Sequence, residues 1–302
     1  MTIAITGSTG FVGQTLLGLA LEHPEDVRAL TRQSQRPRKG IGWISGDLAN
    51  KAALGRLVMG ASCVIHVAGV VNAPDTAGFE AGNVTGTFNL VEAAVAAGVP
   101  RFVFVSSLAA REPGLSAYGA SKLRAERIVK ASGLDWTIVR PPAVYGPRDR
   151  EMLDLFRMAR WGVMPTARNA RASLIHVDDL SRLLLAFAPG GEDVTHMTFE
   201  PDDGKKGGWG QLELARAIGW AMGKKPFVFG LSPAAMMRAA RLDTALRRGK
   251  AKLTADRASY LSHPDWVVSH GARPPAERWR PQIATRDGLR ATAEWYRANG
   301  WL

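Results

Sequence analysis

The segment Ile3-Ala-Ile-Thr-Gly7-Ser-Thr-Gly10-Phe-Val-Gly13 decides the fold of this 302-residue chain. Its apolar start predicts a buried strand, and the amphipathic run 15–21 that follows predicts a helix. Side chains at Gly7, Gly10 and Gly13 would obstruct the tight turn, the approach of a ligand to the backbone, or the packing of helix on strand. The chain therefore begins with a strand, a glycine-rich turn and a helix.

The turn between this strand and this helix suits an anion. A strand that runs directly into a helix leaves the first helical N–H groups without partners, and a pyrophosphate accepts hydrogen bonds from them. The spacing G-x-x-G-x-x-G differs from the G-x-G-x-x-G of the dehydrogenase fingerprint, so a plain turn is the alternative. The position of the glycines between strand and helix favours a binding turn.

Strand-like and helix-like runs alternate through the first half of the chain. The predicted strands are 3–6, 27–31, 63–67, 102–106 and 136–140. The predicted helices are 15–21, 52–59, 83–97 and 121–132. This order is typical of an α/β fold with a doubly wound parallel sheet (Rossmann), in which ligands bind beyond the carboxyl ends of the strands. The alternation fades after about residue 146, which predicts a smaller C-terminal lobe.

The composition is that of a globular protein, with 46% hydrophobic and 22% charged residues and no apolar run long enough to span a bilayer. No basic segment followed by an apolar stretch precedes the first strand, so we expect no secretion signal and a cytoplasmic protein. The single cysteine, Cys63, falls in an apolar run and is interpreted as a core residue. His66 and His176 lie in separate apolar runs, and no zinc-like spacing of ligands occurs, so we expect no metal site.

The net charge of +12 and the pI near 10.3 raise the question of an anionic partner, such as nucleic acid or an anionic surface. The basic residues are scattered, and the sequence holds no zinc-finger spacing, RNP-like aromatic box or long basic arm. We therefore expect no nucleic acid as partner, and an anionic cofactor or small-molecule substrate instead.

Tyr118 and Lys122 are the candidate acid–base pair. They are four residues apart, so both side chains share one helical face if the predicted helix 121–132 begins near Tyr118. An ammonium group close to a phenol favours the phenolate, which suits the phenol for proton transfer. Ser106 and Ser107 end the preceding predicted strand, where a serine hydroxyl can hydrogen-bond a substrate oxygen.

These residues belong to a series of motifs that covers positions 1 to about 185. The motifs are Thr6–Gly13, Gly46–Leu48, Val64–Gly69, Asn83–Thr87, Val105–Ser107, Tyr118–Lys122, Arg140–Pro147 and Ile175–Asp179. In this order the chain resembles the extended short-chain dehydrogenase/reductase family, also described as the NAD-dependent epimerase/dehydratase family. Within it, the chain looks most like the branch of hydroxysteroid-dehydrogenase-like and dihydroflavonol-reductase-like enzymes.

The resemblance implies a role for each matching position. Tyr118 is then the general acid–base, and Ser107 orients the reacting oxygen. Lys122 lowers the pKa of Tyr118 and binds the nicotinamide ribose. Asn83 is a further catalytic candidate, with capping of the predicted helix 83–97 as the alternative. The implied cofactor contacts are Gly7, Thr9, Gly10, Phe11, Val12, Gly13, Asp47, Leu48, Ala68, Gly69, Lys122, Pro141 and Val144.

The end of the second predicted strand bears on the choice of cofactor. NAD sites place an acidic residue there for the ribose 2′-OH, whereas NADP sites place arginine against the 2′-phosphate. The chain has Thr31-Arg32 at this position, with basic residues and no acid in the following segment. Arg32 therefore predicts NADP(H) in preference to NAD(H), and a solvated loop charge is the alternative.

Three functions remain open at this point. The first is an NADP(H)-dependent oxidoreductase acting on a carbonyl or hydroxyl of a small to medium, fairly apolar substrate. The second is a nucleotide-sugar epimerase or dehydratase with tightly bound NAD(P). The interval between Ser107 and Tyr118 is short beside that of the sugar-nucleotide epimerases of this family, which counts against a bulky UDP-sugar site. The third is a non-catalytic NADP-sensing or assembly protein, for which the Ser107, Tyr118 and Lys122 set would be superfluous.

The resemblance also suggests a homodimer and a division of the chain. We expect residues 1–146 to bind the dinucleotide, with 171–190 returning to that domain, and residues 147–302 to form mainly the substrate-binding lobe and lid. Six of the nine tryptophans follow residue 200, and we interpret most as packing of that lobe, with an aromatic substrate pocket as the alternative. The basic run 233–248 predicts an exposed or lid helix, with peripheral membrane contact as the alternative. Asp178 and Asp179 are interpreted as caps of a helix over 180–187.

Overall fold

The computed structural model describes residues 1–22, 26–247 and 253–302. These residues divide into two compact units. Unit 1 consists of residues 1–141, 178–201 and 272–280, and unit 2 of residues 142–177, 202–271 and 281–302. The chain thus leaves unit 1 after Pro141 and returns to it twice.

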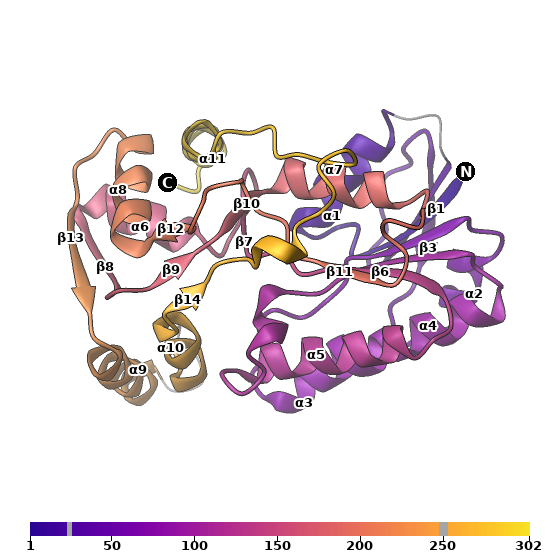
Figure 1. Ribbon diagram of the computed structural model, residues 1–302, viewed down its shortest axis with the longest axis horizontal. Coiled ribbons are helices and arrows are strands. Elements are labelled where there is room, and N and C mark those ends of the chain that lie inside the picture. The colour runs from indigo at the N-terminus through magenta and orange to yellow at the C-terminus, as the bar shows by residue number, and fades with distance from the viewer. Residues whose placement is uncertain (23–25, 248–252) are drawn as a thin grey trace. The chain divides into compact units, whose positions relative to one another are not determined.

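Unit 1 is built on a seven-stranded parallel sheet (Figure 1). Its strand order is β11-β6-β5-β4-β1-β2-β3, so the direction of winding reverses between β1 and β4. At such a reversal the loops that follow the two strands diverge and leave room for a ligand. The strands are β1 (Thr2–Thr6), β2 (Asp26–Thr31), β3 (Ile41–Ser45), β4 (Cys63–His66), β5 (Arg101–Val105), β6 (Asp135–Val139) and β11 (Met197–Phe199).

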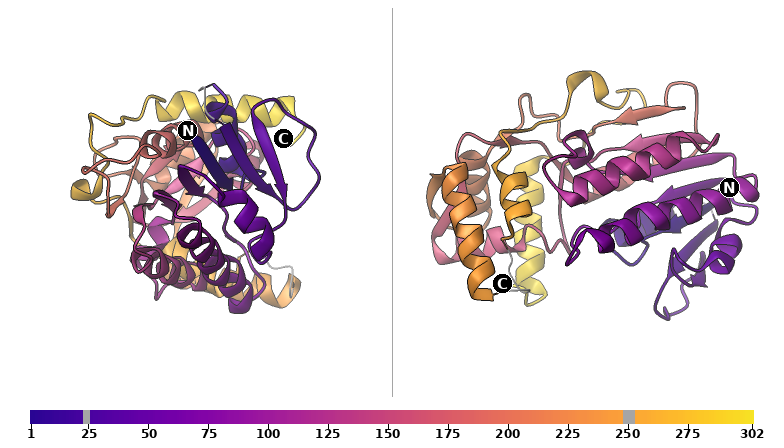
Figure 2. Two further views of the ribbon diagram at one scale, coloured as in Figure 1. Left: turned by 90° about the vertical axis from the view of Figure 1, so that its right-hand side faces the viewer. Right: turned by 90° about the horizontal axis from the view of Figure 1, so that it is seen from below.

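Helices cover both faces of this sheet (Figures 1 and 2). On one face lie α1 (Phe11–Ala20) and α7 (Val177–Phe187), and on the other α2 (Lys51–Val58), α4 (Gly86–Ala96) and α5 (Ala117–Lys130). The core under α2, α4 and α5 joins the fully buried Leu54, Leu90 and Ala125 to strand residues such as Phe102 and Ile138. Shorter elements of unit 1 are α3 (Thr76–Phe79), the π-helix η1 (Glu80–Thr85) and the 3₁₀ helix η2 (Leu108–Arg111). The 3₁₀ helix η4 spans His270–Ala272.

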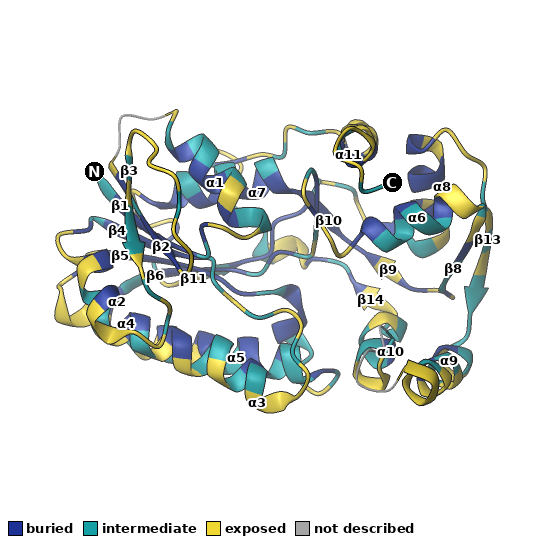
Figure 3. Cartoon of the chain, turned by 180° about the vertical axis from the view of Figure 1, so that it is seen from behind, coloured by how far each residue is buried: buried dark blue, intermediate teal, exposed yellow. Residues whose placement is uncertain are grey.

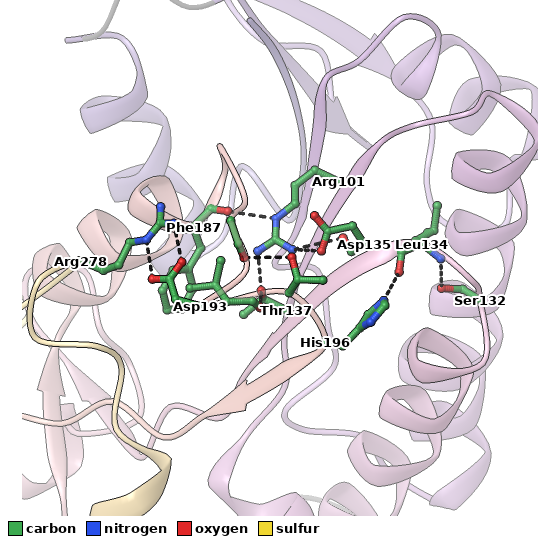
Figure 4. A network of polar contacts seen from close by, with 12 residues as sticks. Arg101, Ser132, Leu134, Asp135, Thr137, Phe187, Asp193, His196 and Arg278 are labelled. Carbon is green, nitrogen blue, oxygen red and sulfur yellow. Dashed lines mark hydrogen bonds and ion pairs between the residues drawn. The ribbon is translucent and has the colours of Figure 1, made fainter.

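A buried arginine holds the amino ends of β5 and β6 together (Figure 4). Arg101 is 3% exposed, and its guanidinium binds the carboxylate of Asp135 at 2.6 Å, the hydroxyl of Thr137, and the carbonyl of Phe187 at the end of α7 at 3.1 Å. Burial lowers the pKa of Arg101, and the carboxylate of Asp135 opposes that shift.

The segment 272–280 is bound to the rest of unit 1 by side chains at its end. Arg278 donates two hydrogen bonds to Asp193, of 2.8 and 2.6 Å (Figure 4). Trp279 Nε1 donates to the carbonyl of Asp179 at 2.9 Å. Trp279 therefore packs in unit 1, whereas the sequence grouped it with the tryptophans of the C-terminal lobe.

Unit 2 contains small sheets packed against helices. Its strands are β7 (Ala143–Tyr145), β8 (Val163–Ala167), β9 (Arg171–Ala172), β10 (Leu174–His176), β12 (Trp209–Gly210), β13 (Phe227–Leu231) and β14 (Asp265–Trp266). Its helices are α6 (Leu153–Trp161), α8 (Gln211–Ala221), α9 (Pro233–Arg247), α10 (Ala255–Ser262) and α11 (Thr285–Ala298). The core joins Tyr145, Phe156, Ile218, Leu289 and Tyr296, and Figure 3 shows the buried sides of α6 and α8.

Several sequence predictions need correction at the level of elements. The strands β3 and β11 were not predicted. The helix expected over 83–97 begins earlier, because Asp75 caps α3 and the chain continues through η1 into α4, so Asn83 does not cap a helix. Asp178 and Asp179 lie inside the first turn of α7 instead of preceding it. The basic helix expected over 233–248 is α9, and Arg248 lies outside the described residues.

Candidate active site

The glycine-rich turn after β1 is held in a conformation that requires glycine. Gly7 has φ +73°, and a Cβ on it would lie 2.6 Å from the amide nitrogen of Ala68. A Cβ on Gly13 would collide with the carbonyl oxygen of Gly7, which lies directly under the first turn of α1. Ser8 Oγ donates to the carbonyl of Leu30 at 2.8 Å and fixes the turn against β2. The turn is therefore closely packed against Ala68 and β2, and its other side, at Thr9 and Gly10, is exposed.

The N-terminus of α1 fits a phosphate group. No side chain caps it at Gly10, and its first turn carries no acidic residue. Thr9 and Gly10 are exposed, while Phe11 and Val12 are half-buried. Because the first N–H groups of a helix attract anions, this end can bind a pyrophosphate, which is how a dinucleotide cofactor would fit these residues.

Helix α5 presents Tyr118 and Lys122 on one face. Ser116 caps the helix by accepting from Gly119 N at 3.0 Å, so α5 begins at Ala117 and includes Tyr118 in its first turn. Lys122 is 4% exposed, donates to the carbonyl of Val105 at 2.8 Å and lies 4.6 Å above the ring of Phe104. Burial lowers the pKa of Lys122 to about 8.

The two serines after β5 have different environments. Ser106 is buried and donates to Glu126 Oε1 at 2.6 Å. Ser107 is half-buried, and its Oγ accepts from Ala109 N at 3.2 Å, which caps η2. Ser106 therefore has a partner inside the fold, whereas the hydroxyl proton of Ser107 remains available to another acceptor.

A buried ion pair lies one turn beyond Lys122 on α5. Glu126 is fully buried, and Arg140 donates to both of its oxygens, at 2.8 and 2.6 Å. Hydrogen bonding to Glu126 raises the pKa of Arg140. Glu200 lies 3.7 Å from Arg140 and 3.7 Å from Arg111, so the pair is part of a larger charge network. The carboxylate of Glu126 also raises the pKa of Lys122, against the effect of burial.

Asn83 joins α5 to the loop after β4. Its Oδ1 accepts from Val70 N at 2.7 Å, and its Nδ2 donates to Val70 O and to Ser121 Oγ, both at 2.9 Å. Ser121 in turn donates to the carbonyl of Tyr118 at 2.7 Å. The side chain of Asn83 is thereby committed to positioning the backbone around Gly69, where a Cβ would lie 3.2 Å from its Oδ1.

His66, at the end of β4, completes this arrangement. Its Nδ1 lies 2.6 Å from Thr6 Oγ1 and its Nε2 lies 2.9 Å from Thr87 Oγ1. Since Thr87 donates to the carbonyl of Asn83 at 2.6 Å, it accepts from His66 Nε2–H, and Thr6 donates to Nδ1. Burial, and then the charge of Lys122, lowers the pKa of His66 to about 3, so the ring is neutral at neutral pH.

The remaining predicted positions lie along the same edge of the sheet or beyond it. Arg32 is exposed after β2, in a turn closed by the hydrogen bond from Thr31 Oγ1 to Gln33 O at 2.7 Å. Asp47 Oδ1 accepts from Ala49 N at 2.9 Å, and the carbonyl of Leu48 accepts from Asn89 at 2.9 Å.

Three further positions follow β4 and β6. Ala68 N donates to Thr6 Oγ1 at 3.3 Å. The carbonyl of Pro141 accepts from Leu108 N at 2.9 Å and fixes the end of β6 beside η2. Val144 belongs to β7 and therefore to unit 2.

Sequence reasoning missed Glu126, Arg140 and the role of His66. The spacing Tyr118, Lys122, Glu126 continues one helical face and was a signal for Glu126. No local pattern links Arg140, at the end of another strand, to that face. Within the described residues, no group of three or more His, Cys, Asp or Glu side chains is arranged to hold a metal ion, and no helix is long and apolar enough to cross a membrane.

Comparison with known proteins identifies the family of the chain. A model of the NAD dependent epimerase/dehydratase family matches residues 3–197. The chain is 38% identical to a ceramide reductase of Caulobacter vibrioides over 99% of this chain and 96% of that protein. It is 30% identical to a 2-alkyl-3-oxoalkanoate reductase of Stenotrophomonas maltophilia over 96% of this chain and 98% of that protein.

A solved structure shares the fold. The structure of MoeE5 in complex with UDP-glucose and NAD has a TM-score of 0.75 at 22% identity and covers 99% of each chain. The match over most of unit 1 and the full-length likeness to named reductases together determine the classification. The chain belongs to the NAD-dependent epimerase/dehydratase family and is an NAD(P)-dependent oxidoreductase of the extended short-chain dehydrogenase/reductase type.

Proposed function

We propose that the protein catalyses the NADPH-dependent reduction of a carbonyl group, and the reverse oxidation, on a small to medium, fairly apolar substrate. The observation that carries this proposal is the placement of Tyr118 and Lys122 on one face of α5 beside the end of β5. The two full-length relatives are both named as reductases, which supports reduction in preference to epimerisation.

Tyr118 acts as the proton donor in this proposal. Its position in the first turn of α5 leaves the phenol half-buried, and Lys122 lies one turn further along the same face. The ammonium of Lys122 stabilises the phenolate that remains after the proton moves to the substrate oxygen. The bound cofactor would supply the hydride to the carbonyl carbon.

Ser107 orients the reacting oxygen. Its hydroxyl proton is available because its Oγ only accepts in the cap of η2, whereas the hydroxyl of Ser106 is already donated to Glu126. Ser107 therefore holds the carbonyl oxygen while Tyr118 protonates it.

Arg32 selects NADPH by binding the 2′-phosphate. The side chain is exposed after β2, in the turn that the hydrogen bond from Thr31 to the carbonyl of Gln33 closes. A planar guanidinium binds a phosphate with paired hydrogen bonds, and the segment 31–40 carries no acid to repel it. The glycine turn and the open end of α1 hold the pyrophosphate.

Unit 2 provides the residues that recognise the substrate in this proposal, and a cytoplasmic homodimer is its expected form. The names of the two relatives suggest the substrates to try first, an oxidised ceramide and a 2-alkyl-3-oxoalkanoate.

The first test is NADPH consumption with these two substrates and with UDP-glucose. Tyr118→Phe should abolish turnover and still bind NADPH in calorimetric titration. Arg32→Ala should weaken NADPH binding by about tenfold or more and leave NADH binding unchanged, with Arg38→Ala as the matched control. Retained NAD with conversion of UDP-glucose and no net NADPH consumption would assign the protein to the epimerases instead.

A further inference from the structure

Unit 2 exposes four large apolar side chains at and beside β8 and β13, Trp161, Val163, Phe227 and Phe229, here called the aromatic face. Trp161 is 77% and Phe227 70% exposed. Phe227 lies opposite Val163 in the parallel pair of β13 and β8, and its N–H donates to the carbonyl of Gly162 at 2.8 Å. The rings of Phe227 and Phe229 are 5.7 Å apart, so these side chains are neighbours.

The aromatic face is the side of β13 turned away from the core. Val228, between the two phenylalanines, packs against the core of unit 2, and Met164 of β8 is buried in it. Successive side chains of a strand point to opposite faces, and a half-exposed strand ordinarily places polar residues on its outer face. Here the outer face carries Phe227 and Phe229 instead.

The segments that carry this face are rich in basic residues. The segments 155–177 and 214–242, which carry the aromatic face, contain no aspartate or glutamate. Their basic residues are Arg157, Arg160, Arg168, Arg171, Arg216, Lys224, Lys225, Arg238 and Arg241. Lys224 and Lys225 are exposed and immediately precede Pro226 and Phe227.

A further tryptophan of unit 2 is in direct contact with cationic side chains. Trp220, at the end of α8, is 46% exposed. The guanidinium groups of Arg286 and Arg290 lie 5.7 and 5.3 Å from its ring centre. Both arginines reach solvent, although Arg290 also pairs with Asp287, and an aromatic ring beneath such side chains suits the headgroup region of a lipid bilayer.

We propose that the aromatic face and the basic residues of the segments that carry it bind the surface of an anionic phospholipid bilayer. Tryptophan and phenylalanine bury their rings at the level of the headgroups, and each nearby lysine or arginine is attracted to anionic lipid. A second copy of the chain fits this surface poorly, because a two-fold contact would bring Lys224 and Lys225 of the two copies close together. The proposal is independent of the substrate.

The test is co-sedimentation of the full-length protein with vesicles of phosphatidylcholine, alone or mixed in equal parts with phosphatidylglycerol. We expect binding to the anionic vesicles that weakens with added salt. Lys224→Glu with Lys225→Glu should weaken binding by about thirtyfold or more, and Trp161→Ser with Phe227→Ser should also weaken it. Quenching of tryptophan fluorescence by brominated lipid should decrease in Trp161→Phe, a conservative change that preserves packing.

Matched controls come from unit 1. Phe88→Ser removes an exposed aromatic of α4, and Arg127→Glu with Lys130→Glu reverses two exposed charges of α5. Both should bind vesicles as the wild type does. Equal binding to neutral and anionic vesicles, or equal loss in the controls, would overturn the proposal.

Two other results would overturn it in favour of another occupant. In the first, the protein does not bind vesicles, and the variants of the aromatic face convert a dimer to a monomer in analytical ultracentrifugation. In the second, the same variants lose binding to a DNA or RNA oligonucleotide while the wild type ignores lipid.

Discussion

Two buried ion pairs lie at opposite ends of the sheet of unit 1. At the amino ends of β5 and β6, Arg101 is paired with Asp135, whose side chain is 33% exposed. At the carboxyl ends, Arg140 is paired with Glu126, whose side chain is fully buried. Burial lowers the pKa of Arg101, whereas hydrogen bonds to Glu126 raise that of Arg140.

The difference shows what each pair does. The Arg101 guanidinium also binds the carbonyl of Phe187, so the pair at the amino ends joins the strands to α7. The carboxylate of Asp135 in this pair is partly accessible to water. The pair at the carboxyl ends excludes water from its acid and adds charge beside Lys122. We infer that the first pair serves packing alone and that the second also determines the electrostatics of the candidate active site.

The largest expected effect separates the two pairs by the same chemical change. Glu126→Gln leaves Arg140 with a charged partner only at 3.7 Å, in Glu200, and should lower the free energy of unfolding by about 3–5 kcal/mol. Asp135→Asn, its matched control, should cost less, about 1–3 kcal/mol, because Asp135 is one-third exposed and Arg101 keeps its hydrogen bonds to Thr137 and to the carbonyl of Phe187. Urea denaturation of both variants measures the difference. Equal losses would mean that burial of the acid does not distinguish the pairs.

Lys122 gives the next largest effect, and a pH dependence. Its folded pKa is about 8 against an ordinary value of 10.5, so the unfolded chain binds more protons between these values. The stability contributed by this residue therefore rises with pH through that window, by about 3 kcal/mol at most. The unfolding free energy of wild type minus that of Lys122→Met should increase from pH 8 towards 10.5.

Glu126 should move that window. Its carboxylate raises the pKa of Lys122, so in Glu126→Gln the rise with pH begins below 8. The same pair of titrations in Asp135→Asn should resemble the wild type, because Asp135 begins β6 at the other end of the sheet. A flat difference between wild type and Lys122→Met would show that the lysine is as well solvated in the fold as in the unfolded chain.

The sequence predicted the elements whose pattern is local. Apolar runs located β1, β2, β4, β5 and β6 to within about a residue, since buried parallel strands are apolar on both faces. The edge strand β3 was missed because it is only partly buried and follows a basic loop. The other edge strand, β11, is three residues long and joins the sheet after a long excursion of the chain.

The candidate site was predictable where its residues lie in one segment. The i, i+4 spacing of Tyr118 and Lys122 needs only the helix. Asn83 was misinterpreted as a possible cap because the π-helix η1, which places its side chain against Val70, has no sequence signal of its own. Arg140 reaches Glu126 through tertiary packing, which no spacing within the chain encodes.

The smallest expected effect concerns the two neighbouring serines. Ser106→Ala removes the 2.6 Å hydrogen bond to buried Glu126 and should cost about 1–3 kcal/mol of stability, with turnover per folded molecule retained. Ser107→Ala removes only the cap of η2 and should cost about 1 kcal/mol, but should lower kcat strongly with little change in the NADPH affinity. Urea denaturation and steady-state kinetics of both variants separate the effects. If Ser106→Ala is the variant that loses turnover, then the assignment of Ser106 to packing and of Ser107 to the substrate is wrong. The ion pair of Glu126 and Arg140 behind Ser106 would then act directly on the reaction.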